Sequence, residues 1–114
     1  MILFEHGRSR TTDPAFDIEQ ARLIALLSDM DRLRVGVSPE HLAEDAPFLD
    51  RWTVGYRPVS CLIGLSTNHP LLPGDGRQIV TSDLVLMSQD RSWARTLSRW
   101  YRLGRPADGA IPDQ

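Results

Sequence analysis

The sequence predicts an α+β domain in which two N-terminal helices pack on a small three-stranded antiparallel sheet. Two observations support this prediction. Residues 13–52 carry two proline-led helix starts and an apolar pattern with a helical period. Residues 57–104 instead hold short apolar runs between turn-forming residues, which is typical of strands. With 114 residues in all, we expect residues 1–114 to form a single domain with one core.

The first helix is expected over about residues 14–34. Asp13 precedes Pro14, which is typical of a helix start because the carboxylate accepts free backbone N–H groups and proline fits the first helical position. Gly36 is the expected stop. One apolar stripe follows the helical period, and its members are Phe16, Leu23, Leu26, Leu27, Met30 and Leu33. We expect this stripe, and above all its leucines and Met30, to be buried against the sheet.

A second, shorter helix is expected after Ser38-Pro39-Glu40, which repeats the helix-start pattern. Pro47 interrupts this helix, so we expect a short helix before it and one or two helical turns after it. Residues 1–12 have no periodicity and are expected to form a flexible arm, and residues 105–114 a tail.

The sheet is expected to contain residues 59–65 and 79–87, two apolar runs of strand type on either side of a proline- and glycine-rich loop. The first helix should cover one face of the sheet, because a small meander cannot bury its apolar side alone.

Residues 92–103 allow two interpretations. In a helix, four arginines lie on one side, opposite Trp93, Leu97, Trp100 and Tyr101. In a strand that follows a hairpin turn at residues 88–91, arginines and aromatic side chains alternate along one face. Periodicity alone favours the helix.

A short pattern within residues 57–104 favours the strand instead. It consists of Asn68-His69-Pro70, Gly76, Thr81-Ser82 and the run Arg95-Thr96-x-Ser98-x-x-Tyr101-x-Leu103-Gly104. The pattern resembles one in small uncharacterised bacterial proteins, in which the pieces look like successive strands of a β-meander. The resemblance implies no activity. We therefore expect residues 92–103 to form the third strand, with the helix as the alternative.

Charge is distributed unevenly along the chain. All 13 basic residues are arginine, and residues 13–50 hold nine acidic residues against three arginines. Residues 91–107 hold five arginines and no acidic residue. These two regions could attract partners of opposite sign or neutralise each other within the fold or across a dimer.

Nothing in the sequence indicates a catalytic, cofactor or metal site. The three histidines lie far apart, and the chain has no lysine for a phosphate-binding loop. The single cysteine, Cys61, lies in an apolar run and is expected to be buried and inert. No apolar run is long enough to span a membrane and the N-terminus lacks the pattern of a signal peptide, so we expect a cytoplasmic protein.

The arginine run is therefore the main functional candidate. We expect a non-enzymatic interaction or regulatory protein that binds a protein partner through Arg91, Arg95, Arg99 and Arg102, or that forms a homodimer through the sheet or this segment. Nucleic-acid binding through the same residues is the alternative, although the low pI of about 5.8 is unusual for that class. A small enzyme that uses Cys61 or His69 is the third hypothesis.

Overall fold

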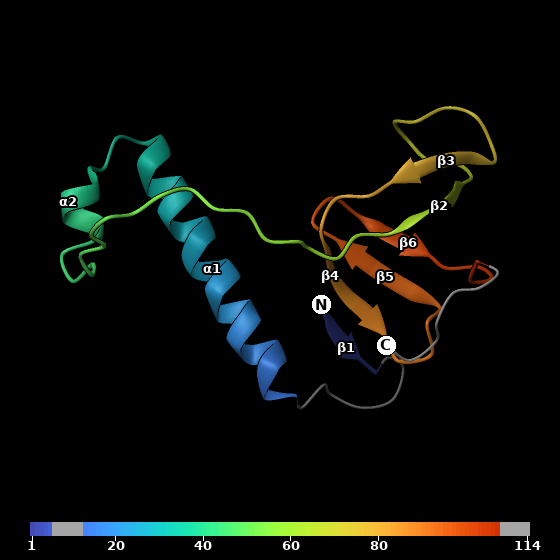
Figure 1. The fold of residues 1–114 in the computed structure, drawn as a ribbon, viewed down its shortest axis with the longest axis horizontal. Helices are drawn as coiled ribbons and strands as arrows, with labels where there is room; N and C mark the ends of the chain where they lie inside the picture. Colours follow the sequence, from blue (N-terminus) through green and yellow to red (C-terminus); the bar gives the residue numbers. More distant parts are fainter. Residues whose placement is uncertain (6–12, 108–114) are drawn as a thin grey trace. The chain divides into compact units, whose positions relative to one another are not determined.

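The protein is described by a computed structural model that covers residues 1–5 and 13–107 (Figure 1). The chain divides into two compact units. A strand unit consists of Met1–Thr11 and Pro58–Gln114, and a helical unit consists of Thr12–Arg57. Parts of the expected arm and tail, residues 6–12 and 108–114, lie outside the described residues.

The helical unit holds α1 (Pro14–Arg34) and α2 (Pro39–Leu42). The bounds of the first helix confirm the prediction. Asp13 Oδ1 accepts a hydrogen bond of 2.9 Å from the Ala15 backbone N–H, and the chain turns away at Gly36, where φ is 92°. No helix of the described residues is both long and apolar enough to cross a membrane.

The short helix expected before Pro47 is present as a single turn. The helical turns expected after Pro47 are absent, because residues 46–50 have no regular structure and Arg51 takes a positive φ of 53°. Pro47 lacks the backbone N–H that a continuing helix needs, and no new helix-start pattern follows it.

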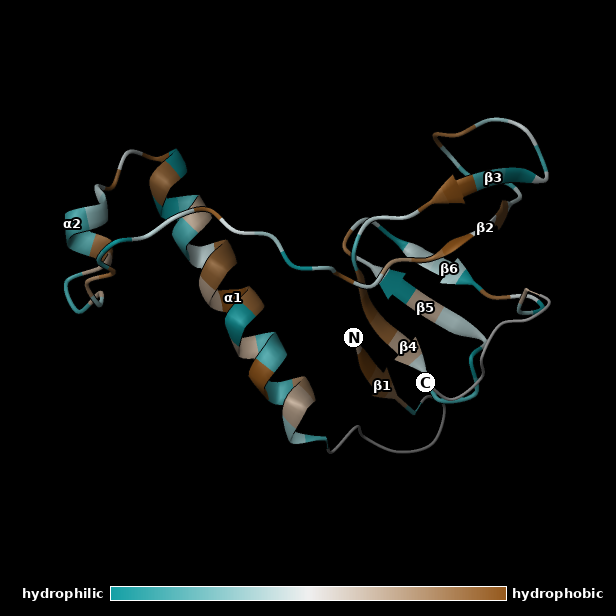
Figure 2. Ribbon diagram, in the orientation of Figure 1, coloured by the Kyte–Doolittle hydropathy of each residue, from teal (hydrophilic) through white to brown (hydrophobic). Residues whose placement is uncertain are grey.

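The expected burial of the α1 stripe is wrong. Neither helix contains a buried residue, and Leu23, Leu27 and Met30 are 39%, 59% and 52% exposed. Figure 2 shows hydrophobic and hydrophilic residues alternating along α1. A helical period predicts that an apolar stripe exists, but it does not say which surface covers that stripe.

The described residues of the strand unit form two sheets. The larger has the order β1-β4-β5-β6, with β1 parallel to β4 and the other pairs antiparallel. A separate hairpin pairs β2 with β3. The strands are β1 (Ile2–Phe4), β2 (Ile63–Ser66), β3 (Arg77–Val80), β4 (Leu84–Ser88), β5 (Trp93–Thr96) and β6 (Trp100–Arg102).

The predicted fold of two helices on a three-stranded antiparallel sheet is therefore wrong. Residues 2–4, expected within the arm, form a parallel edge strand, and the sheet is mixed. The apolar run 79–87 splits at Thr81, whose backbone N–H donates to the Leu62 carbonyl at 2.9 Å and whose hydroxyl accepts from the Leu62 N–H at 2.9 Å. These bonds lie at the open end of the β2–β3 hairpin, where the Thr81 hydroxyl takes the place of a backbone acceptor, and β4 starts beyond them as a strand of the larger sheet.

Residues 92–103 form strands, and the helical alternative is wrong, but there are two strands rather than one. The Thr96 backbone N–H donates to the Arg99 carbonyl at 2.9 Å and closes a tight turn. The Thr96 hydroxyl accepts the backbone N–H groups of Ser98 and Arg99, each at 3.2 Å. By accepting hydrogen bonds from two backbone N–H groups of the turn, Thr96 stabilises a chain reversal. The sequence pattern does not indicate this reversal, because the alternation expected for one strand continues through it.

The core lies on one face of the larger sheet. Leu84, Met87 and Ala94 are buried there, with Leu62 and Leu103 packed against them. A β-bulge between Leu84 and Leu86 brings Leu84 to the same side as Met87. The opposite face of the larger sheet carries a different set of side chains, which is described below.

Candidate interaction surface

The strand register gathers aromatic and basic side chains on the face of the larger sheet opposite the core. Cross-strand partners point to the same side of a sheet, and side chains alternate along each strand. Arg95 pairs with Trp100, and Trp93 pairs with Arg102. Phe4 from the edge strand β1 contacts Trp100 on this side. We call these five residues the aromatic–arginine face.

The Trp100 ring makes edge-to-face contacts with the other two rings of this face. The centroids of Phe4 and Trp100 are 5.9 Å apart with an interplanar angle of 79°, and those of Trp93 and Trp100 are 6.4 Å apart at 90°. The Arg102 guanidinium carbon lies 4.8 Å from the Trp93 ring centroid, within the range of a cation–π contact. These contacts hold the rings and one guanidinium in a fixed arrangement.

This face is open and positively charged. Trp100 is 50% exposed, Arg102 is exposed, and Trp93 and Arg95 are half-buried. Arg95 and Arg102 form no ion pair with a carboxylate in the described part of the chain. The paired residues of this face include no acidic side chain. Among the described residues neither guanidinium is bound to a carboxylate, so both can bind an anionic group.

The structure places only two of the four predicted arginines on this face. Arg95 and Arg102 belong to it, whereas Arg91 lies in the β4–β5 turn with a φ of 59° and Arg99 lies in the β5–β6 turn. Tyr101, which the strand interpretation placed among the arginines, pairs with Ala94 on the core side. Sequence reasoning missed Phe4, although Ile2 and Phe4 are spaced two residues apart, as on one side of a strand, in the segment expected to form an arm.

The hydroxyl groups of the β4–β5 turn have a structural role. Ser88 is fully buried, and its hydroxyl accepts the backbone N–H groups of Ser92 at 3.1 Å and Trp93 at 3.0 Å. The same hydroxyl donates to the Asp90 carboxylate at 2.7 Å. The Ser92 hydroxyl also donates to Asp90 at 2.6 Å. All of these hydrogen bonds stabilise the turn.

His69 also has a structural arrangement. Its Nδ1 accepts the backbone N–H groups of Leu71 and Leu72, both at 3.1 Å, so the ring proton of the neutral imidazole belongs on Nε2. Nε2 lies 3.2 Å from the Tyr101 hydroxyl and donates to it. The loop between β2 and β3 is thereby joined to β6, through two residues of the pattern discussed above.

Cys61 is exposed, so its predicted burial is wrong. The strand that follows it is exposed as well, since Ile63 and Leu65 of β2 are 64% and 74% exposed although they pair with β3. The apolar run therefore predicted a strand but not the burial of its side chains.

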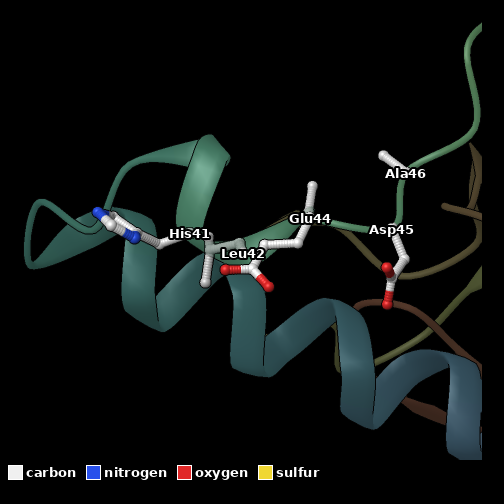
Figure 3. A pocket seen from close by; sticks show the side chains of 6 residues that line it. His41, Leu42, Glu44, Asp45 and Ala46 are labelled. Atoms are coloured by element: carbon white, nitrogen blue, oxygen red, sulfur yellow. The ribbon is translucent and has the colours of Figure 1, made fainter.

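One hollow of about 400 Å³ lies beside α2 (Figure 3). It is lined by six consecutive residues, 41–46, and the His41 ring extends away from the Asp45 carboxylate. A site built for chemistry needs groups that converge from several elements, and none do so here. In residues 1–5 and 13–107 no three histidine, cysteine or acidic side chains are grouped to hold a metal ion.

Comparison with known proteins identifies a family for this chain. The model of a family of unknown function, DUF6634, matches residues 15–112. No curated protein and no solved structure matches the chain significantly.

Proposed function

Since the chain belongs to DUF6634, a family of unknown function, we propose a function for it from the geometry of its sheet. We infer a non-enzymatic interaction protein that binds an acidic and apolar segment of a partner protein through the aromatic–arginine face. The observation that carries this proposal is the pair Arg95 and Arg102, which lie among three aromatic rings without a carboxylate partner in the described chain.

The residue types on this face suit a protein partner. Tryptophan and arginine are the residues that most often dominate the binding energy of protein interfaces, because they combine a large apolar area with directional hydrogen bonding. A guanidinium can hold a carboxylate through two parallel hydrogen bonds. The half-exposed Trp100 offers apolar area next to Arg95, so a segment with alternating acidic and apolar side chains would satisfy both.

The ring geometry argues against nucleic acid as the ligand. Single-stranded nucleic acids bind when bases stack on open ring faces. Here the rings meet edge to face, and Arg102 lies over the Trp93 ring. The net charge of −2 would also repel a polyanion at long range.

A peptide-display selection against the purified chain tests this proposal. We expect selected peptides to be rich in aspartate or glutamate together with leucine or aromatic residues. Their binding should fall at least about tenfold in Trp100→Ala and in the double variant Arg95→Ala/Arg102→Ala, as is usual for interface anchors. Arg77→Ala is the matched control, because Arg77 is exposed on β3 in the other sheet.

Two results would overturn the proposal. One is a selection whose peptides bind the Arg95→Ala/Arg102→Ala variant as well as the original chain. The other is tighter binding of a single-stranded oligonucleotide that the same variants abolish, which would assign this face to nucleic acid. Folding of each variant is checked by its thermal melting curve.

A further inference from the structure

The helix α1 carries a second surface of exposed apolar side chains, which the proposed function does not use. Six side chains spaced alternately three and four residues apart form a seam along it, and we call them the α1 seam: Phe16, Glu19, Leu23, Leu26, Met30 and Leu33. Leu26, Met30 and Leu33 are 56%, 52% and 52% exposed. This alternating spacing is the one by which helices pack side by side.

A helix with this much exposed apolar surface is only marginally stable alone, because helices in proteins are stabilised mainly by packing of their apolar side. We propose that a second copy of this chain covers the seam, with α1 of one copy antiparallel to α1 of the other. The pair is two-fold symmetric, so each contact occurs twice.

Charges beside the seam select the register. Arg22 and Asp29 lie seven residues apart, two helical turns, and therefore on the same flank of α1. When Leu23 faces the partner's Leu26, the Arg22 guanidinium comes beside the partner's Asp29. Phe16 then faces the partner's Leu33, so the apolar side chains at both ends of the seam are covered.

Other arrangements of the two helices place like charges together. A parallel pair in register would put Glu19 against the partner's Glu19 within the seam. An antiparallel pair shifted by two turns, with Leu23 facing the partner's Leu33, would put Asp29 beside the partner's Asp29. Like charges in such positions are destabilising, whereas the first register places Arg22 beside the partner's Asp29 and no like charges within the seam.

Glu19 is accommodated in the proposed register. Its carboxylate accepts a hydrogen bond of 3.0 Å from Arg22 of the same helix, and the partner's Met30 would lie next to it. Arg22 can then serve both carboxylates, its own Glu19 and the partner's Asp29, because a guanidinium has five donors.

Sedimentation analysis of the full chain over a range of concentrations is the first test. We expect a dimer that Leu26→Asp converts to a monomer, while Ile24→Asp, an exposed change off the seam, leaves the dimer intact. A chain that is monomeric at all concentrations overturns the proposal, and so does a dimer that survives Leu26→Asp.

Charge exchange tests the register. Arg22→Asp and Asp29→Arg should each weaken the dimer by about tenfold, since each places two like-charge pairs in the interface. The double variant Arg22→Asp/Asp29→Arg should recover most of the affinity. Arg32→Asp, on the opposite side of α1, is the control and should leave it unchanged. Failure of the double variant to recover would overturn this register.

Cross-linking tests the direction of the helices. In a Cys61→Ser background, Phe16→Cys and Leu33→Cys chains should form a disulfide when mixed and none when oxidised separately. A parallel pair would instead cross-link each variant to itself. Trp100→Ala should not affect dimerisation, so loss of peptide binding and loss of the dimer can be told apart.

Discussion

The strand unit and the helical unit differ in what they bury. Within residues 1–5 and 13–107, all buried side chains belong to the strand unit, and they are Leu84, Met87, Ser88, Ala94 and Thr96. The helical unit contributes none, although α1 is the longest element. The strand unit thus supplies its own core and satisfies its own turns. The described residues of the helical unit have no core of their own, and helices without packed apolar side chains are only marginally stable.

Hydrogen exchange should show the largest difference between the two units. We expect the amides of β4 and β5 to exchange only through global unfolding, because their strands enclose the core. The amides of residues 46–57, which have no regular structure, should exchange at nearly unprotected rates. Protection of α1 should increase with protein concentration if the proposed dimer forms, whereas that of β4 and β5 should not. Equal protection in both units would refute the distinction.

A pair of truncations tests the difference energetically. Met87 is 8% exposed in the core, so Met87→Ala should lower the free energy of unfolding by roughly 2–5 kcal/mol. Ile24 on α1 is 61% exposed, so Ile24→Ala should change it by less than about 0.5 kcal/mol. Denaturant titrations of both variants give the two values. A larger loss for Ile24→Ala would mean that the helical unit has a core contact of its own.

The two units also differ in how far their sequences revealed them. The bounds of α1 were predictable because Asp13, Pro14 and Gly36 act on the backbone next to them. The strands were harder, since their ends depend on hydrogen bonds to distant residues. Thr81 ends β3 through a bond to Leu62, and no local pattern contains that partner.

The interaction surface was partly predictable for the same reason. Alternation within β5 placed Trp93 and Arg95 together as the strand interpretation required. The turn at Thr96 reverses the chain, so Trp100 and Arg102 come to this face in place of Arg99 and Tyr101. Phe4 was missed because parallel pairing joins segments that are distant in sequence.

A smaller effect is expected from the hydroxyl that holds the β4–β5 turn. Ser88→Ala would leave the N–H groups of Ser92 and Trp93 without their buried acceptor, which should cost about 1–3 kcal/mol of unfolding free energy. Ser28→Ala on the exposed surface of α1 is the matched control and should be neutral or slightly stabilising. If both variants unfold at the same denaturant concentration, the serine cluster is not what holds this turn.

The smallest expected effect is local to α2 in the helical unit. Hydrogen bonds from the Glu40 backbone N–H and the Ser38 hydroxyl lower the pKa of the exposed Glu40 carboxyl, because both favour its charged form. A lowered pKa means that these bonds support the folded form above the ordinary pKa of glutamate and are lost as the pH falls through the lowered value. Ser38→Ala removes one of the two donors, so the pKa of Glu40 should move part of the way back. NMR titration of the Glu40 side chain in both chains measures the shift. A Glu40 pKa that is the same in both chains would show that the Ser38 hydroxyl does not contact this carboxylate, and that even this one turn is held by its backbone alone.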